Sequence, residues 1–279
     1  MSDLKNQGNA AFEQERTAGQ RFGFGKNWNG FLKTLDDERI IEAERSLQEM
    51  LGIKDLLGKT WLDIGSGSGL FSLAARRLGA RVHSFDYDPE SVACTESLRS
   101  RFFPDDPEWK VERGSVLDKE YLQSLGKFDI VYSWGVLHHT GKMWEALENA
   151  SIPVNANGKL FIAIYNDQGL LSDIWLKIKQ LYCSGLTGRV VTISTCVPYF
   201  FLRTSLKSLL TGINQFSQYK KERGMSVMHD WIDWIGGLPF EVATPDELIS
   251  YFNSRDFKLQ NQKTVHGLGN NQFVFTKTA

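Results

Sequence analysis

Hydrophobic and polar positions alternate with two different periods between residues 57 and 165. Short apolar runs of strand length, such as TWLDI at 60–64, are each followed by a longer segment with an apolar face. The segment after that first run has Leu70, Ala74 and Leu78 at helical spacing, and Gly79 stands where a C-terminal cap belongs. This alternation predicts a parallel sheet with helices on both faces.

Further strands are expected in the same region and near the carboxyl end. They are RVHSF (81–85), WKVER (109–113), FDIVYS (128–133), KLFIAIY (159–165), FKLQNQK (257–263) and NQFVFTK (271–277). Asp88 followed by Pro89 predicts the start of a helix that runs to about Arg101. Thr244 and Glu247 form a capping box that predicts another helix, and the last two strands form an antiparallel hairpin.

Together these elements predict an α/β fold with a seven-stranded, mostly parallel sheet and a helical insertion after the fifth strand. We divide the chain into an N-terminal helical or lid segment (1–56), a core (57–165), a helical insertion (166–241) and a C-terminal helix with its hairpin (242–279). The stretch between the fifth strand and the hairpin is too long for a simple crossover.

The loop after the first strand, Gly65 to Gly69, alternates glycine and serine. A glycine-rich turn between a strand and a helix lets a ligand approach the backbone, and an acidic residue about 20 positions further on can hold a ribose. Asp86 occupies that position. A dinucleotide fingerprint would need a glycine at Leu70, and no lysine of a phosphate-binding loop follows, so both of these motifs are disfavoured.

Three stretches resemble, in their order, the motifs of class I S-adenosylmethionine (SAM) dependent methyltransferases, most closely the small-molecule branch that includes quinone-biosynthesis enzymes. They are DIGSGSG (63–69), FDYDPES (85–91) and FDIVYSWGVLHH (128–139). The resemblance covers about residues 57–165 and the terminal hairpin. It implies a Rossmann-like core that binds SAM, releases S-adenosylhomocysteine (SAH) and methylates an oxygen or nitrogen atom of a small molecule.

The same resemblance implies which residues hold the cofactor. They are Asp63, Gly65, Ser66, Gly67, Asp86, Tyr87, Ser115, Val116 and Trp134. Asp63 would orient the ammonium group through the loop, and Asp86 would hold the ribose. Serine stands at Ser115 where the family commonly has an acid, which leaves open whether Ser115 or Asp118 reaches the adenine. Trp134 would cover the adenine or the sulfonium.

Methyl transfer from a sulfonium is an in-line displacement, which requires alignment and, for a protonated acceptor, a base. The candidate catalytic residues are His138, His139, His229 and Asp230. The candidate acceptor-binding residues are Trp28, Tyr165, Trp231 and Trp234. The three tryptophans lie in two aromatic, glycine-containing stretches outside the core, 21–31 and 223–243. A pocket lined by aromatic residues with a few carboxylates suits a small polar acceptor. No metal ion is expected, because clustered carboxylates are missing after the fourth strand.

The composition and charge of the chain indicate which kinds of protein it can be. The chain has 279 residues, 42% of them hydrophobic, which is enough for one large core. Its formal charge of −1 gives no reason to expect a nucleic-acid partner. Its three cysteines show no paired spacing and its first residues no apolar signal, so we expect a cytoplasmic enzyme without a transmembrane segment.

Two other functions remain open from the sequence: a nucleic-acid methyltransferase acting on tRNA or rRNA, and a non-catalytic SAM-binding protein. The insertion has three candidate roles. In order of preference it roofs the pocket, forms a homodimer face, or rests on a membrane surface to reach a lipid-like acceptor.

Overall fold

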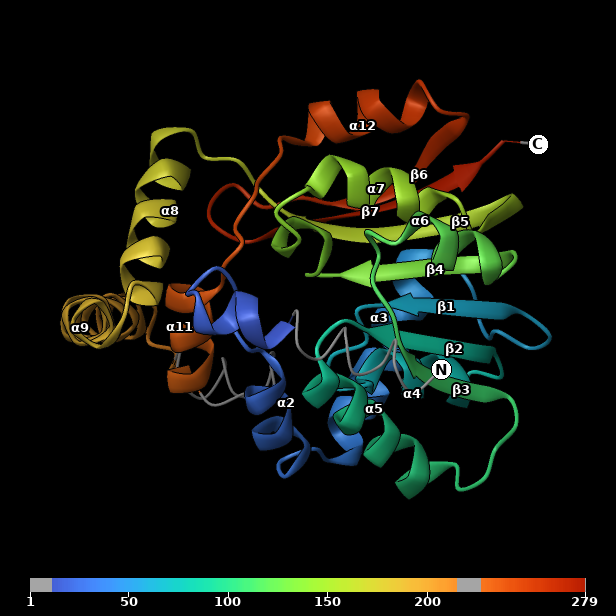
Figure 1. Cartoon of the computed structure of the whole chain (residues 1–279), viewed down its shortest axis with the longest axis horizontal. Coiled ribbons are helices and arrows are strands. Elements are labelled where there is room, and N and C mark those ends of the chain that lie inside the picture. Colours follow the sequence, from blue (N-terminus) through green and yellow to red (C-terminus); the bar gives the residue numbers. More distant parts are fainter. Residues whose placement is uncertain (1–11, 215–226, 279) are drawn as a thin grey trace.

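A seven-stranded sheet forms the centre of the molecule in the computed structural model, which describes residues 12–214 and 227–278 (Figure 1). The strands are β1 (Thr60–Ile64), β2 (Arg81–Asp86), β3 (Trp109–Arg113), β4 (Phe128–Trp134), β5 (Val154–Tyr165), β6 (Phe257–Lys263) and β7 (Asn270–Lys277). Their order is β3-β2-β1-β4-β5-β7-β6, and β7 runs antiparallel to both of its neighbours. The predicted sheet with its C-terminal hairpin is confirmed.

Helices surround this sheet. They are α2 (Gly25–Leu32), α3 (Asp37–Leu51), α4 (Leu70–Arg77), α5 (Pro89–Phe102), α6 (Lys119–Ser124), the short 3-10 helix η1 (Leu137–His139), α7 (Met143–Ser151), α8 (Leu170–Cys183), α9 (Leu186–Thr211), α11 (Val227–Gly236) and α12 (Pro245–Asn253). Helices α3, α4 and α5 lie on one face of the sheet and α6, α7 and α12 on the other. Along β1, Leu62 and Ile64 belong to a core shared with α6, α7 and α12. Trp61, on the opposite face, belongs to a second core shared with α3, α4 and α5.

Local sequence signals explain where several helices begin. The Asp88 side chain caps α5 by accepting a hydrogen bond from the Glu90 N–H at 2.9 Å, and Pro89 occupies the first helical turn. Both hydrogen bonds of the predicted capping box between Thr244 and Glu247 are present at the start of α12. The helix starts predicted at these two positions are therefore confirmed.

Two features differ from the predicted elements. Strand β5 begins at Val154, earlier than the predicted residue 159, because polar residues in its first part interrupt the apolar pattern. Helices α6 and α7 were not predicted. No side chain at the start of α7 caps it; instead the carboxylate of Glu241, far along the chain, accepts hydrogen bonds from the Met143 N–H at 3.0 Å. A cap of this kind leaves no local signal in the sequence.

The chain after β5 forms α8, α9 and α11, which lie beyond the carboxyl ends of β1 and β4 (Figure 1). These helices have an aromatic core of their own, which includes Trp175, Phe200 and Ile235 and is joined by Phe22 of the N-terminal segment. The insertion and the N-terminal segment therefore meet at the edge of the sheet where ligands bind in open α/β folds.

Candidate functional site

The glycine loop joins β1 to α4 at the carboxyl edge of the sheet. Gly65, Gly67 and Gly69 have φ values of +77°, +55° and +82°, a region that residues with a side chain rarely adopt. The N–H groups of Gly65 and Ser66 donate to the Phe85 carbonyl at 2.8 and 3.1 Å. The loop is thus fixed against the end of β2 through its backbone.

All three glycines lie so close to other residues that a side chain would not fit freely; at Gly69 a Cβ would lie 2.9 Å from the Thr95 backbone. A Cβ at Gly65 would lie 2.5 Å from the methyl carbons of Val136, in the segment after β4. A Cβ at Gly67 would lie 3.0 Å from the indole nitrogen of Trp28. The structure therefore brings Trp28, one of the candidate acceptor-binding residues, against the loop.

Asp86, at the end of β2, is bonded to the same loop. One of its carboxylate oxygens accepts a hydrogen bond from the Gly67 N–H and the other from the Asp88 N–H, both at 2.9 Å. Burial raises the pKa of Asp86 to about 6. The neighbouring Tyr87 is half-buried, and the guanidinium of Arg21 lies 5.0 Å from the centre of its ring. The Tyr87 backbone also hydrogen-bonds the Asp86 carboxylate, whose two oxygens together offer about four acceptor sites, so capacity for a ligand remains.

Asp63 is almost completely buried beneath the loop, with 2% of its surface exposed. It accepts a hydrogen bond from the Ser72 hydroxyl at 2.5 Å. The Ser72 proton is used in this bond, so the Ser84 hydroxyl, 2.7 Å away, is the donor to the Ser72 oxygen, and it accepts from the Trp109 indole at 2.9 Å. Burial raises the pKa of Asp63 to about 7, although the Ser72 hydrogen bond acts in the opposite direction.

The remaining residues expected at the cofactor follow β3 and β4. Asp118 caps α6 by accepting a backbone hydrogen bond at 2.9 Å, whereas Ser115 is half-buried in the preceding turn. The Val116 carbonyl accepts from the Asn149 side chain at 2.9 Å. Trp134, the last residue of β4, is half-buried. The Ser115 hydroxyl also accepts a backbone hydrogen bond, from the Leu117 N–H at 3.2 Å, so both side chains are fixed locally and both remain candidates for the adenine.

His139 lies in η1, directly after β4, and is buried. Its Nδ1 is 2.6 Å from the carbonyl oxygen of Pro239. A carbonyl can only accept, so Nδ1 carries the proton and Nε2 keeps a free lone pair. Burial lowers the pKa of His139 to about 3, and the positive charges of Lys179 and Arg21 lower it further. The ring is therefore neutral across the physiological pH range.

His138 is fully buried and packs against Tyr165, with 4.0 Å between the ring centres and the two rings tilted by 40°. Within the described residues neither of its ring nitrogens has a hydrogen-bond partner, and burial lowers its pKa well below the ordinary value. Tyr165 also contacts His139, Trp234 and Phe240, with 5.3, 5.2 and 5.4 Å between ring centres. We call these five residues the aromatic wall.

The insertion supplies the far side of this wall. Lys179 is buried; its ammonium lies 4.6 Å from the Trp234 ring and 4.8 Å from the Phe240 ring, and it donates to the Trp234 carbonyl. Trp231, predicted to bind the acceptor, is buried further out against Phe200, 5.6 Å away.

Helix α11 also contains His229 and Asp230, whose side chains lie outside the described residues. Their predicted catalytic role therefore has no structural counterpart here. In the described ranges, no three histidine, cysteine, aspartate or glutamate side chains gather in a way that would hold a metal ion.

Several residues of the site were not predicted, chiefly in the N-terminal segment. Arg21 donates to Glu15 at 2.6 Å and to the carbonyl of His139 at 3.0 Å. Phe24 lies 5.0 Å from the His139 ring, and the Phe22 N–H donates to the Leu238 carbonyl at 3.0 Å. The two aromatic stretches chosen from composition thus meet beside η1. Their composition indicated the stretches, but not Arg21.

Comparisons with known proteins agree with this architecture. A family model described as a methyltransferase domain matches residues 36–264. The ubiquinone biosynthesis O-methyltransferase of Xanthomonas oryzae pv. oryzae (strain PXO99A) is 34% identical over 114 residues, which cover 40% of this chain and 45% of that protein. The ribosomal protein L11 methyltransferase of Helicobacter hepaticus is 28% identical over 123 residues, which cover 40% and 38%. The chain thus spans less than half the length of these two curated relatives.

Among solved structures, magnesium protoporphyrin IX methyltransferase from Synechocystis PCC 6803 with bound SAH has a similar fold. The TM-score is 0.52 and the sequence identity 12%, with 88% of this chain and 86% of that chain covered. At this identity the similarity concerns the fold alone.

Proposed function

Because the chain belongs to the methyltransferase-domain family, we propose that it transfers a methyl group from SAM to an oxygen or nitrogen atom of a small-molecule acceptor. The observation that carries this proposal is the glycine loop, whose Gly67 lies beneath Trp28 and donates its N–H to Asp86. SAM has an amino-acid part and a nucleoside but no phosphate. A bare backbone next to a carboxylate suits such a molecule better than it suits a phosphate, which Asp86 would repel.

The residues on this edge fit the cofactor. Gly65, Ser66 and Gly67 offer backbone without bulky side chains, and Asp86 has lone pairs left for the ribose hydroxyls. Asp63, Tyr87, Ser115, Val116 and Trp134 complete the proposed cofactor residues. When bound, SAM supplies a methyl group on a positively charged sulfur. The structural relative from Synechocystis, crystallised with SAH, supports the same choice of cofactor.

The aromatic wall is the proposed acceptor surface, with Trp28 on the side of the loop. Rings at several angles around Tyr165 make a surface for a small molecule with a flat or apolar part. The names of the two relatives include both a ribosomal-protein enzyme and a ubiquinone-biosynthesis enzyme. A wall of this kind favours the small acceptor over a protein. Trp231, one ring further out, would support the wall rather than touch the acceptor.

His139 is the strongest candidate for the residue that orients the acceptor. Its Nδ1 donates to Pro239, so the Nε2 lone pair is free to accept a hydrogen bond from an acceptor hydroxyl or amine. With a pKa of about 3 it is a weak base, so its main contribution is alignment for in-line attack. Buried His138 would position Tyr165 and His139. His229 and Asp230 remain proposed catalytic residues from the sequence alone.

The test is methyl transfer from isotope-labelled SAM to a panel of hydroxy-aromatic, amine and sugar-like acceptors, with mass spectrometry of the products. We expect label on a small molecule, and we expect His139→Ala to lose most turnover while SAH affinity stays within about tenfold. Label found only in added RNA or protein would refute the small-molecule assignment. SAH binding without turnover of any acceptor would favour a non-catalytic SAM-binding protein.

A further inference from the structure

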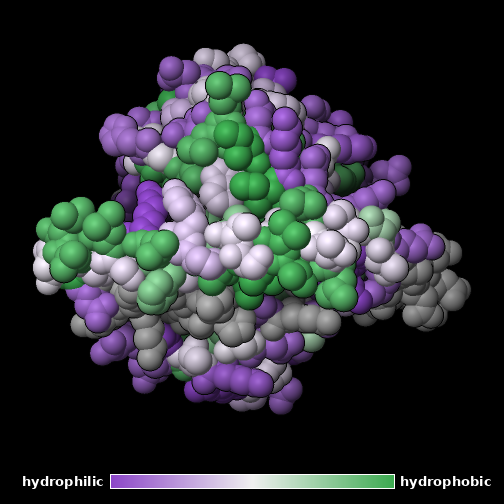
Figure 2. Space-filling view, turned by 90° about the vertical axis from the view of Figure 1, so that its left-hand side faces the viewer, coloured by the Kyte–Doolittle hydropathy of each residue, from purple (hydrophilic) through white to green (hydrophobic). Residues whose placement is uncertain are grey.

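The exposed apolar side chains of the described chain gather on two helices of the insertion. Apart from Ile41, Leu57 and Trp144, every large exposed hydrophobic residue of the described part lies between residues 170 and 213. They are Leu170, Leu171, Ile174, Leu181, Leu186, Val190, Val191, Ile193, Tyr199, Phe201, Leu202, Leu206, Leu209, Leu210 and Ile213. Figure 2 shows hydrophobic side chains in a band across this face of the molecule. We call them the α8–α9 surface.

The length and burial of α9 show how far this surface extends. The helix has 26 residues, which corresponds to about 39 Å. It packs against the rest of the insertion through Gly188, Thr192 and Phe200, and none of residues 201–213 is buried. Soluble proteins rarely leave an apolar patch of this size without a partner. The helix is not a membrane span, since no helix in the described ranges is both long and apolar enough to cross a bilayer.

The charges on the same helices indicate which partner fits. Helix α9 contains three basic residues and no acidic one, and α8 adds an exposed lysine beside one exposed aspartate. The exposed charged residues are Arg189, Arg203, Lys207, Lys177 and Asp173. The whole chain, by contrast, has a net charge of −1. The apolar surface is therefore locally positive in a chain that is close to neutral overall.

We propose that the α8–α9 surface docks on a lipid membrane that carries anionic headgroups, without crossing it. Exposed leucines and aromatic rings would enter the headgroup region while the basic side chains bind lipid phosphates. A second copy of this chain fits less well, because a two-fold contact would bring like charges together. The proposal rests on surface residues alone and does not depend on the proposed reaction.

The α8–α9 surface lies next to the aromatic wall, so a membrane bound to it would lie close to the proposed acceptor site. Trp175 of α8 stacks on Phe200 of α9, with 5.6 Å between ring centres, and also contacts Trp234 of the aromatic wall at 5.7 Å. The membrane would therefore lie against the outer side of the same aromatic core whose inner side reaches Tyr165.

Co-sedimentation with vesicles tests the proposal. One vesicle type contains phosphatidylcholine only, and the other contains equal parts of phosphatidylcholine and phosphatidylglycerol. We expect the full chain to bind the anionic vesicles and to be released by high salt. The variant Leu209→Glu with Leu210→Glu should lose at least about a hundredfold in partitioning, because two exposed leucines no longer enter the lipid. Arg203→Glu with Lys207→Glu should lose at least about tenfold.

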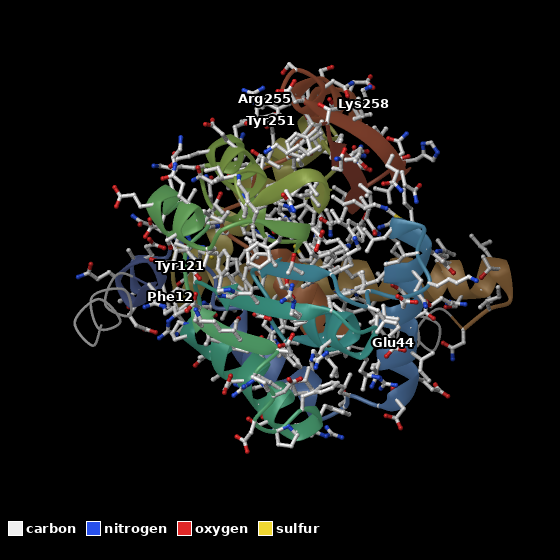
Figure 3. All side chains as sticks on the ribbon, turned by 90° about the vertical axis from the view of Figure 1, so that its right-hand side faces the viewer. Phe12, Glu44, Tyr121, Tyr251, Arg255 and Lys258 are labelled. Carbon is white, nitrogen blue, oxygen red and sulfur yellow. The ribbon has the colours of Figure 1, made fainter. Side chains whose placement is uncertain are left out.

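The controls use exposed residues elsewhere; of the two apolar ones, Ile41 and Leu57, Ile41 is the less exposed at 55%. Ile41→Glu with Leu57→Glu adds the same two charges; Leu57 is 72% exposed, compared with 80% for Leu209 and 76% for Leu210. Lys258→Glu with Lys263→Glu reverses two exposed basic residues of β6. Lys258 lies on the side of the molecule that faces the viewer in Figure 3, away from the face in Figure 2. Both controls should bind like the unmodified chain. Circular dichroism shows whether each variant is folded.

Three results would overturn the proposal. The first is a folded chain that binds neither vesicle type. The second is equal binding by the charge-reversal variant and the unmodified chain. The third is a dimer in light scattering that Leu209→Glu with Leu210→Glu dissociates, together with no vesicle binding, because the surface would then be a subunit interface.

Discussion

Replacing Asp63 with asparagine should stabilise the protein at alkaline pH. The carboxyl group is 2% exposed, and burial raises its pKa to about 7, whereas an aspartic acid in an unfolded chain titrates near 3.9. The charged form is thus less favourable in the folded protein than in water. Asparagine has nearly the same shape, keeps an oxygen for the Ser72 hydroxyl and is never charged.

The pKa difference sets the size of the effect. It corresponds to about 4 kcal/mol at 1.36 kcal/mol per pKa unit. The raised pKa means that the folded state binds this proton more tightly than the unfolded state. The contribution therefore favours folding below about pH 4 and is lost as the pH rises to about 7. The amide must also find a partner for its N–H groups, so we expect a net gain of about 2–4 kcal/mol at pH 8.

Urea unfolding followed by tryptophan fluorescence at pH 5 and pH 8 measures this gain. The advantage of Asp63→Asn over the unmodified chain should grow by about 2–3 kcal/mol between the two pH values. Asp105→Asn is the matched control, because Asp105 is exposed and its φ of +55° is one that asparagine tolerates. An advantage that is the same at both pH values, or a loss of stability at pH 8, would contradict the reasoning.

Three further substitutions probe the cofactor edge. Asp86→Ala should weaken SAH binding by about 1.5–3 kcal/mol in calorimetry, because hydrogen bonds to a charged group are lost; an unchanged Kd would place the ribose elsewhere. Gly67→Val should abolish SAH binding while circular dichroism still shows a folded chain, because its side chain would fill the space beneath Trp28; normal binding would give the loop another role. Trp28→Ala should keep SAH affinity within about tenfold and lose most turnover, and equal losses of both would move Trp28 from the acceptor to the cofactor.

The fold could be predicted where local signals are strong. The strands read as apolar runs, and α5 and α12 begin at caps formed by neighbouring residues, Asp88 and Thr244. Helix α7 was not predicted, because the residue that caps it, Glu241, lies at the far end of the insertion in the sequence. The early start of β5 was not predicted, because Val154 joins the strand through its pairing with Phe128 of β4 and not through an apolar pattern in the sequence.

The candidate site shows the same division between local and distant information. The glycine loop and Asp86 follow from spacing within one strand–turn–helix unit, and the structure joins them by a hydrogen bond. The proton position on His139 could not be predicted, because it depends on Pro239 in a distant segment. Buried Lys179, between two rings of the wall, reads in the sequence as one more lysine of an amphipathic helix.

Calorimetric titration of the full chain with SAH, and separately with NAD, shows which of the two ligands the glycine loop binds. We expect saturable binding of one SAH per chain and no binding of NAD, because Leu70 occupies the position of the third glycine that a dinucleotide requires. Binding of NAD but not of SAH would contradict the account and reassign the glycine loop to a different chemistry.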